Sequence, residues 1–111
     1  MIDTPDPTWP QPAPTLTTRE RAALKARAHA LEPVVRVGRA GVTDAVVADI
    51  DRALETHELI KVKIGEGDRD ARVARTATIA AHTGAAVVQS VGRILILWRP
   101  RPDEARSAPN V

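Results

Sequence analysis

The spacing of apolar residues along the chain changes repeatedly, and each change predicts a new element of secondary structure. Apolar side chains recur three or four positions apart in three stretches, which is the spacing of one helix face. These predicted helices begin at Thr17, at Thr43 and near residue 69. Four shorter runs rich in β-branched or aliphatic residues predict strands. These runs are 34–37, 59–64, 86–91 and 93–99.

The order αβαβαββ predicts an α/β fold in which a four-stranded mixed sheet packs with the helices. The last two strands are joined by a glycine turn, so they are expected to be antiparallel, whereas strands joined through a helix are expected to be parallel. In the second strand Ile60, Val62 and Ile64 alternate with two lysines. Lys61 and Lys63 are therefore expected on the opposite face of the sheet from the apolar set.

Residues at the helix ends suit the predicted boundaries. The Thr17 hydroxyl can cap the first helix while Glu20 reaches back in a capping box, and Pro33 is expected to stop that helix. Thr43 is expected to cap the second helix, and Gly84 to end the third. The predicted inward residues are Leu24, Ala28 and Leu31 in the first helix, Val46, Val47, Ile50, Ala53 and Leu54 in the second, and Val73, Ala77, Ala80 and Ala81 in the third.

Proline-rich segments flank this pattern. Residues 1–15 include five prolines in a polar stretch, and residues 101–111 combine proline with mixed charge. Neither segment has the apolar periodicity that a core requires, so both are predicted to be disordered tails around one domain at 16–100. Trp9, within the first tail, is either a short docking element or incidental.

Composition restricts the chemistry open to this chain. It has no cysteine, so disulfides, thiolate nucleophiles and thiolate metal sites are excluded. No run approaches the ~18 apolar residues of a membrane span, and no signal-peptide pattern precedes the domain. A soluble cytoplasmic protein without membrane association is expected.

The charges are unevenly distributed although the net charge is only +2. Residues 15–41 carry six Lys or Arg against two acidic residues, and residues 42–60 carry five acidic residues against one Arg. This separation of charge has two interpretations. Either the basic block faces a polyanionic partner that approaches from one side, or both blocks are ordinary solvated helix faces. Phe and Tyr are absent, so a nucleic acid would be held through its backbone and shape, without a platform for stacked bases.

One short motif stands out between the first strand and the second helix. Gly38 and Gly41 flank Arg39 and Ala40, just before a helix begins. Glycine allows close approach to the backbone, and amide groups near a helix start attract anions. The motif alone does not separate phosphate binding from a purely conformational turn. The basic row of Arg21, Lys25 and His29 on the first helix is either a basic ridge that leads toward the next segment or a solvated flank beside the buried stripe.

The sequence offers little for catalysis. His29, His57 and His82 match no metal-binding spacing, and Asp68 and Asp70 suit the start of the third helix better than a cation site. No nucleotide-binding or nucleophile motif is present. The chain is therefore predicted not to be an enzyme, with no cofactor and no metal.

Taken in order, the segments resemble a known family. These segments are Leu24 to His29, Pro33 to Val35, Gly38 to Gly41, His57 to Ile64, Gly84-Ala85, and Val91 to Pro100. Together they resemble the CRM domain, specifically the stand-alone bacterial YhbY-type form, over about residues 17–100. The resemblance implies a fold akin to the C-terminal domain of translation initiation factor three, and an RNA-binding protein associated with precursors of the large (50S) ribosomal subunit.

The resemblance also implies which residues would contact RNA. The family's G-x-x-G loop matches Gly38 to Gly41, and its basic surface matches Lys25, His29, Lys61 and Lys63, with Arg19 and Arg21 extending it along the first helix. The middle pair of the loop is Arg-Ala, so a side-chain hydrogen bond from its second position is lost.

Two functions follow as expectations. The first is an RNA-binding protein, monomeric when free, that assists large-subunit assembly by holding ribosomal RNA. The alternative is a protein-interaction module that docks through the acidic second helix and the proline-rich tail.

Overall fold

The computed structural model describes residues 14–65 and 67–100. The two predicted tails lie outside the described residues, except for residues 14 and 15. Seven elements follow the predicted order: α1 (Thr18–Ala28), β1 (Pro33–Val37), α2 (Asp44–His57), β2 (Leu59–Ile64), α3 (Arg69–Thr83), β3 (Ala86–Val91) and β4 (Ile94–Trp98).

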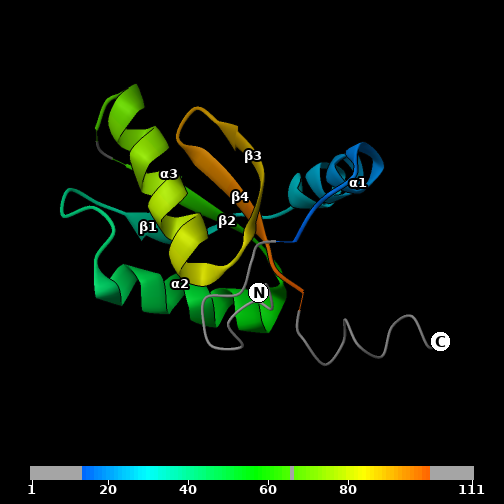
Figure 1. The fold of residues 1–111 in the computed structure, drawn as a ribbon, viewed down its shortest axis with the longest axis horizontal. Coiled ribbons are helices and arrows are strands. Elements are labelled where there is room, and N and C mark those ends of the chain that lie inside the picture. Colours follow the sequence, from blue (N-terminus) through cyan, green and yellow to red (C-terminus); the bar gives the residue numbers. More distant parts are fainter. Residues whose placement is uncertain (1–13, 66, 101–111) are drawn as a thin grey trace, which may run out of the picture.

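The four strands form one mixed sheet in the order β1-β2-β4-β3 (Figure 1). β1 and β2 are parallel, as expected for strands joined through α2, and β4 pairs antiparallel with both β2 and β3. The hairpin between β3 and β4 turns at Gly92, whose φ of 58° suits glycine. β2 and β3 therefore run in the same direction, with β4 inserted between them.

Both faces of the sheet are covered, by different helices. On one face, α2 and α3 bury a cluster that includes Ile50, Val62 and Leu95. On the other face, α1 packs Leu24 and Ala28 in a second cluster with parts of β2, β3 and β4. Figure 1 shows α1 on the other side of the sheet from α3. The apolar run in β4 lacks alternation because its residues point alternately into these two clusters.

The helix ends confirm the predicted caps. Thr17 and Glu20 exchange both bonds of a capping box, at 3.0 and 2.9 Å. The Thr43 hydroxyl accepts from the Val46 amide at 3.2 Å, and Gly84 ends α3 in the left-handed conformation. Each cap satisfies backbone groups that the helix itself leaves unpaired.

Two details of the prediction were wrong. Helix α1 ends at Ala28, well before Pro33, because the chain tightens into turns there: the amides of His29 and Leu31 donate to carbonyls three residues back. Pro33 is instead the first residue of β1, an edge strand where a missing amide is tolerated.

The inward face of α3 also differs from the prediction. Val73 is 60% exposed and Ala77 and Ala81 are exposed, while Ile79 and Thr83 are fully buried. Ile79 lies about 120° around the helix from Val73, at 100° per residue. An isoleucine side chain has more apolar surface to bury than a valine or an alanine side chain. Thr83 can be buried beside it because its hydroxyl donates to the Ile79 carbonyl at 2.8 Å.

Arg99 fastens the end of β4 to both α2 and α3. Its guanidinium donates to the Asp51 carboxylate and to the Thr83 carbonyl at 2.7 Å, and a third bond reaches the Asp51 carbonyl at 3.2 Å. The side chain is only 13% exposed. This interaction holds the two helices against the end of the sheet that lies opposite the glycine motif.

Candidate nucleic-acid interface

Three loops meet at the end of the sheet where β1 and β2 finish. The Gly65 amide donates to the Val37 carbonyl at 2.8 Å, which joins the segment after β2 to the end of β1. The Arg93 guanidinium donates to the Gly65 carbonyl at 2.8 Å, which adds the β3–β4 turn. Because parallel strands end at the same edge, the starts of α2 and α3 lie here too. Figure 1 shows the loops after β1 and β2 on the side of the molecule away from α1.

Residues 38–41 form a tight turn with an exposed tip. The Gly41 amide donates back to the Gly38 carbonyl at 3.0 Å, and the Thr43 amide donates to the Gly41 carbonyl at 3.1 Å. Arg39 and Ala40 at the tip are exposed, and within the described residues their amides have no protein acceptor. The Gly41 amide, by contrast, is engaged within the turn and does not face a ligand.

The two glycines of this turn have different structural requirements. Gly41 is buried and has a φ of 81°, a conformation that other residues rarely adopt. Gly38 has an ordinary φ, and a Cβ added there would meet no atom within 4 Å. Gly41 is needed by the turn itself, whereas Gly38 leaves open space that an incoming ligand can use.

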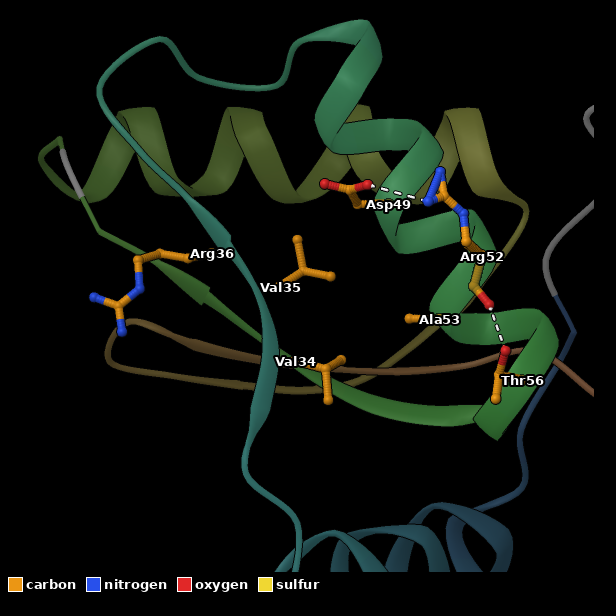
Figure 2. Close-up of a pocket in the computed structure, with 7 residues that line it drawn as sticks. All are labelled: Val34, Val35, Arg36, Asp49, Arg52, Ala53 and Thr56. Carbon is orange, nitrogen blue, oxygen red and sulfur yellow. Dashed lines mark hydrogen bonds and ion pairs between the residues drawn. The ribbon is translucent and has the colours of Figure 1, made fainter.

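A basic face extends from this turn across the sheet. Lys61 and Lys63 lie on the face that α1 covers in part, opposite the cluster that contains Val62, as predicted. The parallel register pairs Arg36 with Lys63, so Arg36 lies on the same face. Figure 2 shows Arg36 and Val35 on opposite sides of β1. Arg36, Lys61 and Lys63 are called the basic face below.

Arg36 was absent from the residues expected to contact RNA. The signal was in the sequence: Arg36 lies between Val35, which packs against the first cluster, and Val37, which is fully buried in it. Alternation therefore already placed it on the other side of the strand. Only the register showed that its neighbour there is a lysine.

Lys61 is partly engaged within the protein. Its ammonium donates to the Leu31 carbonyl at 3.0 Å, at the point where the chain passes from α1 to β1. An ammonium has three donors, so this bond leaves two of them for another partner. Lys63, two residues nearer to the glycine turn, is half-buried.

The predicted basic row on α1 divides into residues with different surroundings. Arg21 is half-buried, and its Nη1 donates to the carbonyls of Val87 and Val88 at 2.7 and 2.8 Å, where β3 bulges. Arg21 therefore attaches α1 to β3, a structural role that the sequence pattern did not predict. Lys25, one turn further on, is half-buried, and His29 is exposed at the end of the helix.

Arg19 lies apart from that row. It is exposed and precedes the buried Leu24 by five residues, which places it about 140° around the helix from the side that packs on the sheet. Figure 1 shows α1 at the other side of the molecule from the glycine turn. The basic face lies on the strands between them, so the predicted site residues follow a path across the sheet and do not form one compact cluster.

Acidic residues gather on the opposite side. Asp44, Asp49 and Glu55 are exposed on α2, the helix that covers the other face of the sheet. Asp49 faces Arg52 at 3.6 Å in an exposed pair. The charge blocks seen along the sequence thus become two different faces of the folded chain.

The candidates for catalysis stay dispersed. His29, His57 and His82 are exposed and belong to three different helices or helix ends. No group of three possible metal ligands occurs among the residues that the structure describes. Asp68 accepts from the Ala71 amide at 2.9 Å, and so caps α3 as expected. No helix in residues 14–65 and 67–100 is long and apolar enough to cross a membrane.

Comparison with known proteins identifies the family. Residues 16–99 match the sequence profile of the CRS1 / YhbY (CRM) domain, which covers almost the whole folded part. The chain belongs to the CRM domain family. The predicted membership of this family is thereby confirmed for the domain as a whole.

Relatives of similar length support this assignment. An "RNA-binding protein" of Haemophilus influenzae is 43% identical over 95 residues, which are 86% of this chain and 96% of that protein. A Pseudomonas aeruginosa protein named "Probable RNA-binding protein" is 35% identical, with 86% and 92% of the two chains covered.

A solved structure shows the same fold. The solution structure of a hypothetical protein from Staphylococcus aureus superposes with a TM-score of 0.69 at 28% identity, and the match covers 78% of this chain and 90% of that one. The predicted α/β fold class is therefore confirmed both by the arrangement of the elements and by this likeness.

Proposed function

We propose that this CRM domain binds structured RNA through the tip of the glycine turn and the basic face, without catalysing a reaction. The observation that carries the proposal is the parallel register of β1 and β2. It puts Arg36 and Lys63 side by side, directly ahead of the turn at 38–41. The turn could then bind one phosphate of an RNA strand while Arg36 and Lys63 bind the next phosphates of the same RNA strand.

The groups at the turn suit a phosphate oxygen. The exposed amides of Arg39 and Ala40 can donate to one phosphate, and the Arg39 guanidinium can donate to it or to its neighbour. The turn follows the carboxyl end of a parallel strand and precedes a helix, which is where open α/β sheets commonly bind anions.

The residues of the basic face suit a folded RNA better than an extended single strand. Arg36, Lys61 and Lys63 offer charge and hydrogen bonds but no ring on which a base can stack. Recognition would then depend on the path of the backbone. The family resemblance supports ribosomal RNA of large-subunit precursors as the target. The protein would bind it as a monomer.

The glycine turn can be tested with one pair of substitutions at Gly38. Gly38→Asp places a negative charge where the phosphate would lie, and Gly38→Asn is its uncharged match in size. Both should fold, because the space around Gly38 is open and its φ is ordinary. Gly41 is unsuitable for this test, because its φ of 81° strains any substitution.

The measurement is fluorescence anisotropy with a transcribed fragment of large-subunit ribosomal RNA, titrated at several salt concentrations. Gly38→Asp should weaken binding at least tenfold more than Gly38→Asn does, which corresponds to about 1.4 kcal/mol. Equal binding by the two variants would remove the turn from the proposed interface.

The alternative function, a protein-interaction module, is tested by affinity purification with and without ribonuclease. Partners that survive digestion of RNA would favour it.

A further inference from the structure

One arginine side chain borders the glycine turn on its other side, away from the basic face. Arg75, from the second turn of α3, is half-buried there. A Cβ added to Gly41 would lie 3.6 Å from its Nε, and one added to Gly67 would lie 3.0 Å from its Nη1. The guanidinium of Arg75 therefore occupies the space between the loop after β1 and the loop after β2.

The lack of side chains at both glycines allows this close approach. Gly41 and Gly67 have φ angles of 81° and 102°, so each supplies a backbone turn that other residues rarely adopt. At Gly67 an added Cβ would also lie 2.8 Å from the Cβ of Ala71. Two glycine loops and one arginine side chain thus form a single packed unit at this end of the sheet.

Arg93 adds a second guanidinium to the same end. It is exposed in the β3–β4 turn, and its Nη1 donates to the Gly65 carbonyl at 2.8 Å. A guanidinium has five donors, so this bond leaves most of them to face solvent.

We propose that Arg75 and Arg93 form a second phosphate-binding site for the RNA that the glycine turn binds. This inference rests on the proposed function. The RNA backbone would continue past the turn toward Gly65 and Gly67, instead of ending at Arg39. Guanidinium groups suit this task because their planar fork pairs with two phosphate oxygens at once.

The site makes the end of the sheet a continuous anion-binding surface. Arg39 lies at the tip of the turn, Arg75 lies behind the turn, and Arg93 lies beyond the next loop. The positive ends of the α2 and α3 dipoles point to the same region, which adds to the attraction without defining the site.

The test compares Arg75→Gln and Arg93→Gln with Arg52→Gln as a matched control. Arg52 is an exposed arginine on α2, outside the proposed interface, where it pairs with Asp49. Binding of the same ribosomal RNA fragment is measured across a salt series. Each of the first two variants should weaken binding about three- to tenfold and lower the slope of log affinity against log salt by ~0.7 to 0.9. Arg52→Gln should change neither quantity.

A structural role of Arg75 would give a different result. Arg75→Lys keeps the charge but loses the fork, so the salt slope should return to the parent value while some affinity is lost. If Arg75 only held the loops together, the lysine and glutamine variants would show the same salt slope as each other. Thermal unfolding of each variant, followed by circular dichroism, shows which of them keep the fold.

The outcomes separate this inference from the proposed function. If Gly38→Asp abolishes binding while Arg75→Gln and Arg93→Gln match Arg52→Gln, the glycine turn binds RNA and the second site is wrong. If the parent protein itself does not bind the fragment with a salt-dependent affinity, both proposals fail. A slope lowered by the two arginine variants but not by Arg52→Gln supports the second site.

Discussion

Replacing Arg21 by methionine separates the structural and RNA-binding readings of α1. Methionine keeps most of the apolar stem but cannot donate to the carbonyls of Val87 and Val88. Those two bonds, at 2.7 and 2.8 Å, share one charged nitrogen, so their contributions do not simply add. A hydrogen bond from a charged group contributes about 1.5 to 3 kcal/mol, and we expect Arg21→Met to cost about 2 kcal/mol in total.

The loss should be measurable as a change in both stability and α1 packing. For a domain of this size, 2 kcal/mol corresponds to a fall in Tm of about 8 to 16 °C. Trp98 packs against the cluster that holds Leu24 and Ala28, so its fluorescence reports on the attachment of α1. A Trp9→Phe background leaves Trp98 as the sole emitter during urea unfolding, and far-UV circular dichroism follows the whole domain.

Lys25→Met is the matched control, one helical turn along the same flank. It should change stability by less than about 0.5 kcal/mol, because no bond joins Lys25 to the sheet among the described residues. If it contacts RNA, it should lower the salt slope of binding. The reasoning is refuted if Arg21→Met unfolds at the same urea concentration as the parent and lowers the salt slope, because Arg21 would then act as a phosphate ligand.

Two further predictions test the core and the end of β4. Ile79→Ala should destabilise the domain by about 2 to 5 kcal/mol, as expected for a fully buried isoleucine, whereas Val73→Ala should cost under about 0.5 kcal/mol, since Val73 is 60% exposed. If the two substitutions destabilise the domain equally in urea unfolding, the inward face first predicted for α3 would be right. Arg99→Gln should cost about 1.5 to 3 kcal/mol. Asp51→Asn should cost about 1 kcal/mol, because the Thr83 carbonyl also accepts from that guanidinium and the Asp51 side chain is 39% exposed. A larger loss from Asp51→Asn in thermal unfolding would contradict this order.

Local patterns in the sequence predicted most of the fold. The order of elements, the caps at Thr17 and Thr43, the alternation of β2 and the turn at 38–41 all depend on residues close together in the chain. Such features are decided by backbone geometry and by the period of apolar residues, so they can be read without a partner segment. The prediction of RNA binding came from the family resemblance, which depends on several such patterns occurring in one order.

The face of α3 could not be predicted in the same way. Both Val73 with its alanines and Ile79 with Thr83 give a helical stripe, and the sequence contains nothing that ranks them. The choice depends on the total apolar area buried against the sheet, and on whether the Thr83 hydroxyl finds an acceptor inside the helix. Both are properties of the packed helix and not of its sequence period.

The candidate site likewise combines features that the sequence predicts with features that depend on tertiary structure. By itself the sequence determined the glycine turn at 38–41 and the lysine face of β2, because a turn and an alternation need only neighbouring residues. Only the tertiary structure decided that Arg36 joins Lys63, that Arg21 is tied to β3, and that Arg75 lies behind Gly41. Those pairs are between 27 and 66 residues apart, so strand register and helix packing had to bring them together before their chemistry could be inferred.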